Sequence, residues 1–281
     1  MGKIIAGKTI VKTFGKGEEK TNALDGVDIE ISKGEFVAVM GPSGCGKSTL
    51  LFSLSGTDSI TSGSVCFDGM ELSGLSENTL ADIRRTKMGF VFQQPTMLKN
   101  LNLLDNIILP ALQENRKNTV KITQKAKDIM KKTGIAGLEE RGITEVSGGQ
   151  LQRAGICRAL MSAPEILFGD EPTGSLNSKS AEEIMELLSD INENGTAILL
   201  VTHDTKVAAR ADRVLFMKDG VIKSELASGK FKGKDLENRT EKVVAQEMLF
   251  TAFRACNPRI FCDFRFASLT KNTSRDTGCE Q

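Results

Sequence analysis

Tryptophan and tyrosine are absent from this sequence, and its 281 residues include a single histidine, His203. One histidine nearly excludes a histidine metal cluster, and it nearly excludes Ser-His-Asp catalysis away from His203. No apolar run approaches the ~20 residues that a membrane-spanning helix needs, and the first residues, MGKIIAGKTI, lack the apolar core of a secretory signal. We therefore expect a cytosolic protein, which would need a separate spanning partner for any work at a membrane.

An excess of charge of one sign is also missing, because 37 basic and 36 acidic side chains leave a formal net charge of +1. This balance gives no global electrostatic reason to expect nucleic acid or an anionic lipid surface as the main partner. The six cysteines are scattered and form no C-x-x-C pair, so free thiols are favoured over disulfides. With 40% hydrophobic and 26% charged residues, the composition is that of an ordinary globular protein with one large or two small domains.

Short apolar strands alternate with helical patterns along most of the chain. The predicted strands are 3–14, 24–32, 35–40, 62–69, 89–94, 165–172 and 197–204, followed by a strand pair, RVLFMKDG and VIKSEL, within 213–226. The predicted helices are 47–56, 76–87, 120–137, 148–164 and 178–192. Between about 100 and 160 the strand signals vanish, and a helical subdomain is expected over about 95–160. Strands that alternate with helices predict an α/β fold with a parallel, doubly wound sheet, which an all-helical insert interrupts.

A glycine-rich loop, GPSGCGKST, occupies residues 41–49 between a predicted strand and a predicted helix. It matches G-x-x-x-x-G-K-[ST], in which glycines let backbone N–H groups wrap phosphates and the lysine adds a positive charge. The flanking elements favour this P-loop over a fortuitous glycine-rich turn. The hydroxyl of Ser48 is predicted to bind Mg²⁺. The residues predicted to hold the nucleotide are Gly41, Ser43, Gly44, Cys45, Gly46, Lys47, Ser48 and Thr49.

The apolar run EILFGDEP, at 165–172, ends in two carboxylates. Asp170 is predicted to reach the Mg²⁺ ion, and Glu171 is predicted to take a proton from an attacking water. The alternative is a solvated strand end without a ligand. Because the carboxyl edge of a buried parallel strand is where ligands bind, the functional interpretation is favoured.

A second glycine-rich segment, TEVSGGQLQR, stands at 144–153, where a predicted helix begins. Backbone N–H groups at a helix start can hold a phosphate, although a plain helix cap is the alternative. The sequence thus contains two candidate phosphate-binding loops, at 41–49 and at 144–153, and the patterns alone do not explain why one chain would have both.

The P-loop, GFVFQQ, VSGGQLQR, ILFGDEPTGSLN and LLVTHD occur in this order. Over residues 3 to about 228 this set resembles the ATP-binding subunits of ABC (ATP-binding cassette) transporters. The resemblance implies a P-loop NTPase fold with an N-terminal antiparallel β-subdomain, a mostly parallel central sheet and an all-helical subdomain that carries the signature VSGGQ. It also implies an ATPase that uses ATP and Mg²⁺.

The resemblance further implies a head-to-tail homodimer, in which each P-loop faces the signature of the other chain. The second glycine-rich segment is then half of a shared site rather than a second independent one. The signature residues expected to close over ATP held by the partner chain are Ser147, Gly148, Gly149 and Gln150.

Other residues take their roles from the resemblance alone. Gln93, at the end of a predicted strand, would contact Mg²⁺ and the attacking water, and His203 would reach the γ-phosphate and support Glu171. Phe14 would stack on adenine, with burial in the core as the alternative. Asn177 stands where the family often has aspartate, which puts the coupling of the two sites in question but not ATP binding.

The P-loop also contains a thiol, that of Cys45. N–H groups at a helix start favour a thiolate, so we expect Cys45 to be reactive and its alkylation to block ATP binding.

The phrase LSENTLADIRRTKMGFVFQQ resembles the subgroup that powers lipoprotein release, macrolide export and antimicrobial-peptide resistance. The ending VTHDTKVAARADRVLFMKDG is most similar to the peptide-resistance branch. The resemblance implies an integral membrane permease as partner, so the subunit would be cytoplasmic and peripheral on the inner face of the membrane. The helical insert near Pro95–Pro110 is the expected contact, although its apolar residues could equally serve internal packing. The cargo would be determined by the permease.

Three other functions compete with a transporter. A soluble ABC ATPase of ribosomes or DNA would normally show two cassettes or a coiled-coil insertion, and neither is present, so no nucleic-acid partner is expected. An ATPase partner of a cell-division-type regulatory permease, which does not transport, stays open. A degenerate, non-hydrolysing subunit is disfavoured because every core catalytic residue is present.

The family pattern stops near residue 228, which suggests an ABC ATPase domain over 1–228 and a C-terminal tail over 229–281. The segment KFKGKDLENRTEKVVAQEML could form a helix. The phenylalanines and arginines after it could contact nucleic acid or a membrane, or the tail could be poorly ordered or non-native, for example after a late frame change. The abrupt end of the pattern favours the second interpretation.

Overall fold

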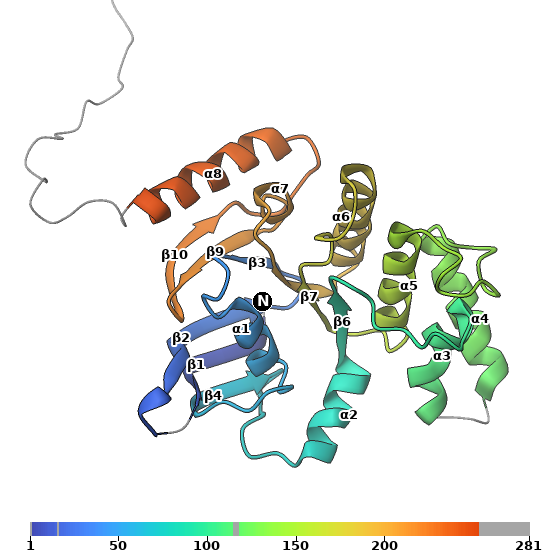
Figure 1. Cartoon of the computed structure of the whole chain (residues 1–281), viewed down its shortest axis with the longest axis horizontal. Coiled ribbons are helices and arrows are strands. Elements are labelled where there is room, and N and C mark those ends of the chain that lie inside the picture. The colour runs from blue at the N-terminus through green and yellow to red at the C-terminus, as the bar shows by residue number, and fades with distance from the viewer. Residues whose placement is uncertain (1, 16, 115–117, 253–281) are drawn as a thin grey trace, which may run out of the picture.

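The structure is a computed structural model that describes residues 2–15, 17–114 and 118–252 (Figure 1). Its smaller β-sheet is antiparallel, with the strand order β2-β1-β4-β5. Along β2, buried apolar residues alternate with exposed acidic ones between Val27 and Ile31, so that one face of this sheet joins the core. The strands are β1 (Lys3–Phe14), β2 (Thr21–Ser32), β4 (Ser62–Phe67) and β5 (Met70–Glu71), and the short 3-10 helix η1 (Gly17–Glu19) lies between β1 and β2.

The larger sheet has the order β10-β9-β3-β8-β7-β6, in which the pairs from β9 to β6 are parallel and β9–β10 is antiparallel. All residues of β3 and β8 are buried, as in parallel strands covered on both faces. Val37 and Val39 join the core on one face, whereas Phe36 and Ala38 join the core on the other. The strands are β3 (Phe36–Met40), β6 (Met88–Phe92), β7 (Ile166–Asp170), β8 (Ala197–Val201), β9 (Arg213–Lys218) and β10 (Val221–Ala227).

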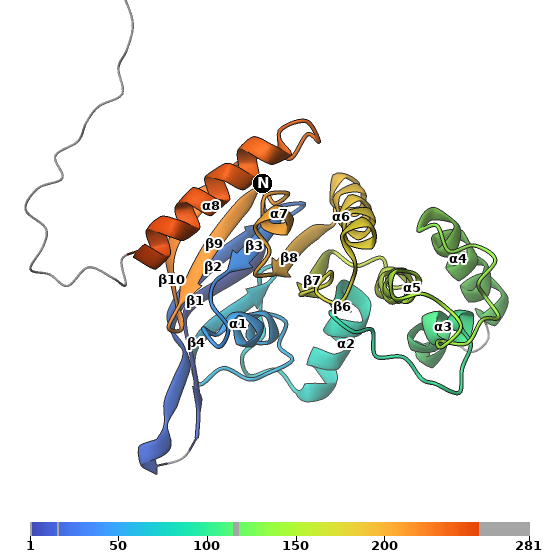
Figure 2. The same cartoon turned by 45° about the horizontal axis from the view of Figure 1, so that its top comes forward.

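Helices cover both faces of this sheet, with α1 on the face toward the antiparallel sheet and α6, α7 and α8 on the opposite face (Figure 2). Ser76 caps α2, as its place before the helical pattern predicts. The helices are α1 (Lys47–Leu54), α2 (Glu77–Lys87), α3 (Leu103–Glu114), α4 (Thr119–Lys132), α5 (Gly148–Leu160), α6 (Ser178–Glu193), α7 (Thr205–Ala208) and α8 (Leu236–Ala252).

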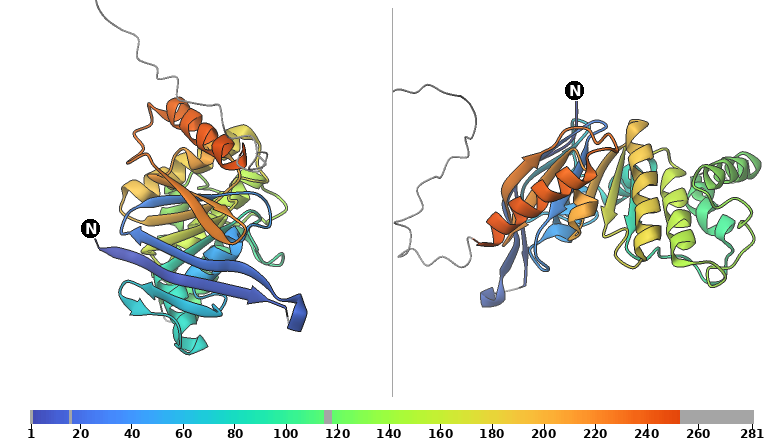
Figure 3. Two further views of the ribbon diagram at one scale, coloured as in Figure 1. Left: turned by 90° about the vertical axis from the view of Figure 1, so that its left-hand side faces the viewer. Right: turned by 90° about the horizontal axis from the view of Figure 1, so that it is seen from above.

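Helices α3, α4 and α5 form a helical subdomain with a core of its own, which includes Leu103, Ile107, Met130 and Cys157. Figure 3 shows this subdomain at the end of the molecule away from the antiparallel sheet. Helix α5 packs against the edge strand β6, whereas α1 follows the central strand β3. The P-loop and the signature of one chain therefore start helices on different parts of the molecule.

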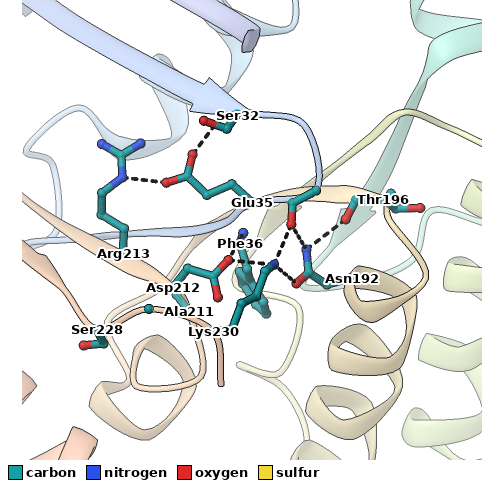
Figure 4. Close-up of polar contacts among 12 residues, drawn as sticks. Ser32, Glu35, Phe36, Asn192, Thr196, Ala211, Asp212, Arg213, Ser228 and Lys230 are labelled. Carbon is teal, nitrogen blue, oxygen red and sulfur yellow. Dashed lines mark hydrogen bonds and ion pairs between the residues drawn. The ribbon is translucent and has the colours of Figure 1, made fainter. Parts of the chain in front are cut away.

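The segment after β10 is fastened to the core by two cations. The ammonium of Lys230 contacts the carbonyl of Gly34 at 2.6 Å, Oδ1 of Asn192 at 3.0 Å and a carboxylate oxygen of Asp212 at 2.9 Å (Figure 4). The buried guanidinium of Arg239 donates to four backbone carbonyls in the loops before β9 and after β10. These bonds hold α8 against the sheet.

The predicted fold class is confirmed: the chain has the antiparallel subdomain, the mostly parallel sheet and the helical subdomain. The predicted strand 197–204 ends earlier, at Val201, because Asp204 caps the short helix α7, which the sequence did not reveal. The division at residue 228 stays a prediction, and the structure describes α8 beyond it. The aromatic and basic residues from 253 onward lie outside the described residues. Within the described ranges, no helix is long and apolar enough to cross a bilayer.

Candidate functional site

The P-loop connects β3 to α1, and two of its glycines are required by sterics. Gly41 and Gly46 have φ of 154° and 104°. A Cβ on Gly41 would overlap the carbonyl oxygen of Met217, and one on Gly46 would overlap that of Ala23. Gly46 is also the N-cap of α1, where no side chain caps the helix. The first N–H groups of α1 thus lack the side-chain acceptor that helix starts usually have, which suits them to an anion.

Lys47 folds back over this loop. Its ammonium donates to the carbonyl oxygens of Gly41 at 2.8 Å and Pro42 at 3.0 Å. A positive charge is thereby held beside the uncapped helix start, as binding of a phosphate requires.

Ser48 and Asp170 meet although 122 positions separate them in the sequence, because α1 starts beside the carboxyl end of β7. The Ser48 hydroxyl donates to Oδ1 of Asp170 at 3.1 Å. Burial raises the pKa of the Asp170 carboxyl above its usual value, the Ser48 hydrogen bond opposes this rise, and the charge of Glu171 adds to it.

The Ser48–Asp170 pair fits Mg²⁺ chemically, since both donors are hard oxygens. Among the described residues, no group of three or more histidine, cysteine or acidic side chains could hold a metal ion by itself. An ion here would therefore take its remaining ligands from phosphate oxygens and water, which is the usual arrangement for Mg²⁺ in nucleotide sites.

Glu171 and His203 also come together. Nδ1 of His203 lies 2.7 Å from Oε1 of Glu171, and the hydroxyl of Thr202 donates to Oε2 at 3.4 Å. Glu171 has φ of 49°, which is uncommon for a residue with a Cβ, and its N–H donates to the carbonyl of Val201. The side chain of Glu171 is largely buried, whereas that of His203 is 74% exposed.

Gln93 follows β6 and lies beside the turn after Glu171. Its carbonyl accepts a hydrogen bond from Ser175 at 3.0 Å, and a Cβ at Gly174 would lie 2.9 Å from Nε2 of Gln93. The side chain of Gln93 is exposed. The structure thus brings the predicted Gln93 close to the loop that carries Glu171.

The signature forms a complete helix cap. The hydroxyl of Ser147 accepts from the N–H of Gln150 at 3.3 Å, and Oε1 of Gln150 accepts from the N–H of Ser147 at 2.9 Å. VSGGQ therefore does form a helix cap, the alternative considered from the sequence, and both hydrogen bonds of this cap are made within one chain. Ser147 and Gly148 are nevertheless exposed, so this surface is open to another molecule.

The signature helix α5 also approaches the start of α6. A Cβ on Gly149 would lie 3.0 Å from Oγ of Ser180. Asn177 caps α6 by accepting from the N–H of Ser180 at 2.9 Å. Asparagine and aspartate are equally good caps, so the departure at Asn177 keeps the local fold intact.

Phe14 is 48% exposed, so the alternative of a core phenylalanine is wrong. The ammonium of Lys12 lies 5.0 Å from the centroid of its ring and is held by Asp58 at 2.6 Å. One face of the ring therefore meets a fixed cation.

The expectation of a reactive Cys45 thiolate is wrong. Cys45 is only 5% exposed, and burial raises the pKa of its thiol, an effect that the positive charge of Lys47 only partly opposes. The side chain points into the core beneath the loop, where it packs with the cluster that includes Leu50 and Met217. A helix start favours a thiolate only where the sulfur is near water.

Sequence reasoning missed two residues of this region, Thr202 and Lys12. Thr202 stands directly before His203 in LLVTHD, and the position next to a predicted site residue was the only signal. Lys12 stands two residues before Phe14, in a strand, where side chains two apart share a face.

Comparison with known proteins agrees with this geometry. Residues 24–174 match the sequence profile of the family described as ABC transporter. The chain is 41% identical over 219 residues to the macrolide export ATP-binding/permease protein MacB of Mannheimia succiniciproducens, and the match covers 78% of this chain and 34% of that protein. This chain therefore spans about one third of the length of that relative.

Two further relatives match over most of their own length. The chain is 40% identical over 232 residues to the bacitracin export ATP-binding protein BceA of Halalkalibacterium halodurans, covering 80% of this chain and 89% of that one. A solved dimeric structure of the ATP-binding cassette MJ0796, in a post-hydrolysis state bound to ADP and Pi, has a TM-score of 0.75 and 38% identity, covering 81% of this chain and 100% of that one.

The export proteins among these relatives are consistent with the subgroup that the motifs indicated. The family match also covers more than half of the chain, from within β2 to the loop after Glu171. The chain therefore belongs to the ABC transporter family and contains its ATP-binding domain.

Proposed function

We propose that this subunit hydrolyses ATP, that two copies share each ATP between them, and that the reaction drives a separate membrane permease. The observation that carries the proposal is the meeting of three motifs at one edge of the sheet, with Ser48 bonded to Asp170 and Glu171 bonded to His203. The carboxyl edge of a parallel sheet is the place where such folds bind their ligands.

Each residue has a role in this proposal. The N–H groups at the start of α1 and the ammonium of Lys47 bind the β- and γ-phosphates of ATP. Ser48, Asp170 and Gln93 would hold Mg²⁺, which when bound neutralises charge on the phosphate oxygens. Glu171 removes a proton from the attacking water.

The other proposed roles are supportive. His203 orients the Glu171 carboxylate and lies at the exposed side of the site, where it would reach the γ-phosphate. Phe14, whose side chain is half exposed, offers its ring to adenine. The remaining proposed contacts to ATP are made by Gly41, Ser43, Gly44, Cys45, Gly46, Ser48 and Thr49, of which Cys45 contributes its backbone.

The second copy supplies the signature. Ser147 and Gly148 are exposed at the start of α5, on the helical subdomain rather than at the P-loop of their own chain. In a head-to-tail pair these residues, with Gly149 and Gln150, would close over ATP held by the other copy. A dimeric cassette structure that is 38% identical to this chain supports the arrangement.

The permease contact is proposed at a groove beside the helical subdomain. A cavity of about 650 Å³ lies between β6, α2 and α3, and its lining includes Phe90, Phe92, Pro110 and Arg158. The exposed Leu98 adds apolar surface nearby, in the loop before α3. Leu103 and Ile107 are buried, so the insert near Pro95–Pro110 supplies both internal packing and an outer surface.

The cargo is proposed by analogy with the relatives, one named for macrolide export and one for bacitracin export. We propose antimicrobial-peptide resistance or export of peptide or lipoprotein-type substrates, with an ATPase of a non-transporting, cell-division-type permease as the second candidate. Affinity purification of the tagged chain from membranes tests the partner: a co-purifying multi-span permease supports the proposal, and recovery of the chain alone from the soluble fraction contradicts it.

A further inference from the structure

The carboxylate of Glu171 is held at both oxygens, by two donors of opposite character. His203 contacts Oε1 at 2.7 Å from an exposed position. Thr202 donates to Oε2 at 3.4 Å and is only 1% exposed. One donor is therefore free to move toward solvent or substrate, and the other is enclosed by the core.

The direction of the Thr202 proton is determined by its other partner. Oγ1 of Thr202 accepts a hydrogen bond from the N–H of Asp204 at 3.0 Å. A hydroxyl has one proton, and with this acceptor position taken its proton can point to Oε2 of Glu171. The hydroxyl at this position therefore acts as a donor to the carboxylate.

The backbone around Thr202 is rigid. Its N–H donates to the carbonyl of Val39 at 3.1 Å, which ties the end of β8 to the neighbouring strand β3. A β-branched side chain has few rotamers, so the hydroxyl keeps one position. Asp204, which donates to Thr202, is itself fixed because its side chain caps α7.

Glu171 benefits from a rigid donor. Its φ of 49° lies in the left-handed region, which is strained for a non-glycine residue, so the surrounding contacts must maintain it. Proton transfer also depends on sub-ångström placement of the base.

We propose that Thr202 is a positioning residue, which holds Oε2 of Glu171 so that Oε1 faces the attacking water when His203 turns away. The proton that leaves the water then arrives at Oε1, while Thr202 keeps the carboxylate in register. This inference rests on the proposed function, in which Glu171 is the base. At 3.4 Å the bond is longer than a usual hydroxyl–carboxylate bond, so we expect it to shorten when ATP is bound.

The test compares Thr202→Val, which removes the hydroxyl at nearly constant shape, with Thr202→Ser, which keeps it. Thr202→Val should lower kcat about tenfold or more, the effect expected for loss of a hydrogen bond to a charged group, while the KM for ATP stays within about twofold. Thr202→Ser should recover most of kcat.

A matched control is Thr133→Val, which removes another buried hydroxyl, bonded to Ile129 and Cys157 in the helical subdomain. This control should change the melting temperature and leave kcat unchanged. A wild-type kcat in a folded Thr202→Val protein would overturn the inference. So would a loss that Thr202→Ser does not recover, or one that follows the fall in melting temperature as in the control.

A Glu171→Gln protein separates the two levels of the argument. If it hydrolyses ATP normally, the proposed function itself fails. If it is inactive and Thr202→Val keeps the wild-type kcat, only the role of Thr202 fails.

Discussion

Helices α1 and α5 both start at a glycine-rich loop, but their first turns differ. Helix α1 starts at Gly46, with no side-chain cap, beside the ammonium of Lys47. Helix α5 is capped by Ser147, in a capping box that pairs the N–H groups of Ser147 and Gln150. A bound anion therefore stabilises the start of α1 more than the start of α5. The start of α5 is already capped, so its exposed residues can contact a ligand that is bound at another loop. This difference supports the proposal that the two loops form opposite halves of a shared site.

The largest effect is expected at Glu171, the proposed base. Glu171→Gln should lower the rate of hydrolysis by about 10²–10⁴-fold and leave ATP binding intact, because glutamine keeps the shape but cannot take the proton. The rate of phosphate release measures hydrolysis, and an equilibrium titration measures ATP binding. A normal rate of phosphate release would refute the role of Glu171.

A smaller effect, on binding, is expected at the start of α1. Lys47→Ala should weaken ATP binding by the isolated chain about tenfold or more, because a charged donor to the phosphates is lost. Ser147→Ala should leave binding by the isolated chain unchanged, because in the proposed dimer the signature contacts the ATP held by the other copy. Titration calorimetry compares the two, and equal losses in both variants would remove the distinction between the loops.

Asp170 should show the cost of its charge when no cation is bound. Burial raises the pKa of Asp170 in the folded protein, so the neutral carboxyl favours folding and the ionised carboxylate opposes it. The stability gained from the neutral form is fully present below the unfolded pKa and is lost as pH rises through the higher folded pKa. Asp170→Asn should therefore raise the melting temperature of the nucleotide-free protein by about 2 °C at neutral pH, and by less near pH 4. A lower melting temperature at neutral pH would contradict this.

The smallest effect concerns the cap itself, and the chain offers a matched pair. Ser147 and Ser76 both accept from a backbone N–H at 3.3 Å, at the starts of α5 and α2. Changing either to alanine should lower the free energy of unfolding by about 1 kcal/mol, as urea titration would measure. ATP-driven association should suffer in Ser147→Ala alone. Equal association defects in both variants would mean that the signature acts only through stability.

The fold and most of the site were predictable because their signals are local. A five-residue apolar run such as FVAVM predicts a buried strand, and the P-loop and Asp170 both stand at the end of such a run. Parallel pairing then brings the carboxyl ends of the strands to one edge of the sheet. The proximity of Asp170 to the P-loop can therefore be predicted without the tertiary structure.

Other features depend on contacts between distant parts of the chain, which the sequence does not reveal. The burial of Cys45 depends on packing against residues of β9, and the exposure of Phe14 depends on where β1 ends. The hydroxyl of Thr202 donates a hydrogen bond to Glu171, which is 31 positions away in the sequence. The anchoring of α8 by Lys230 and Arg239 likewise requires loops that come together only in the folded domain.

The most direct test of the shared site is the molecular mass of the Glu171→Gln protein, measured by light scattering with and without ATP. A base that cannot act should trap the closed pair, so the mass should double on addition of ATP. Ser147→Arg, which places a bulky charged side chain on the signature, should abolish the doubling while ATP still binds. A Glu171→Gln protein that binds ATP and stays at the mass of one chain would contradict the shared site, as would a doubling that Ser147→Arg leaves unchanged.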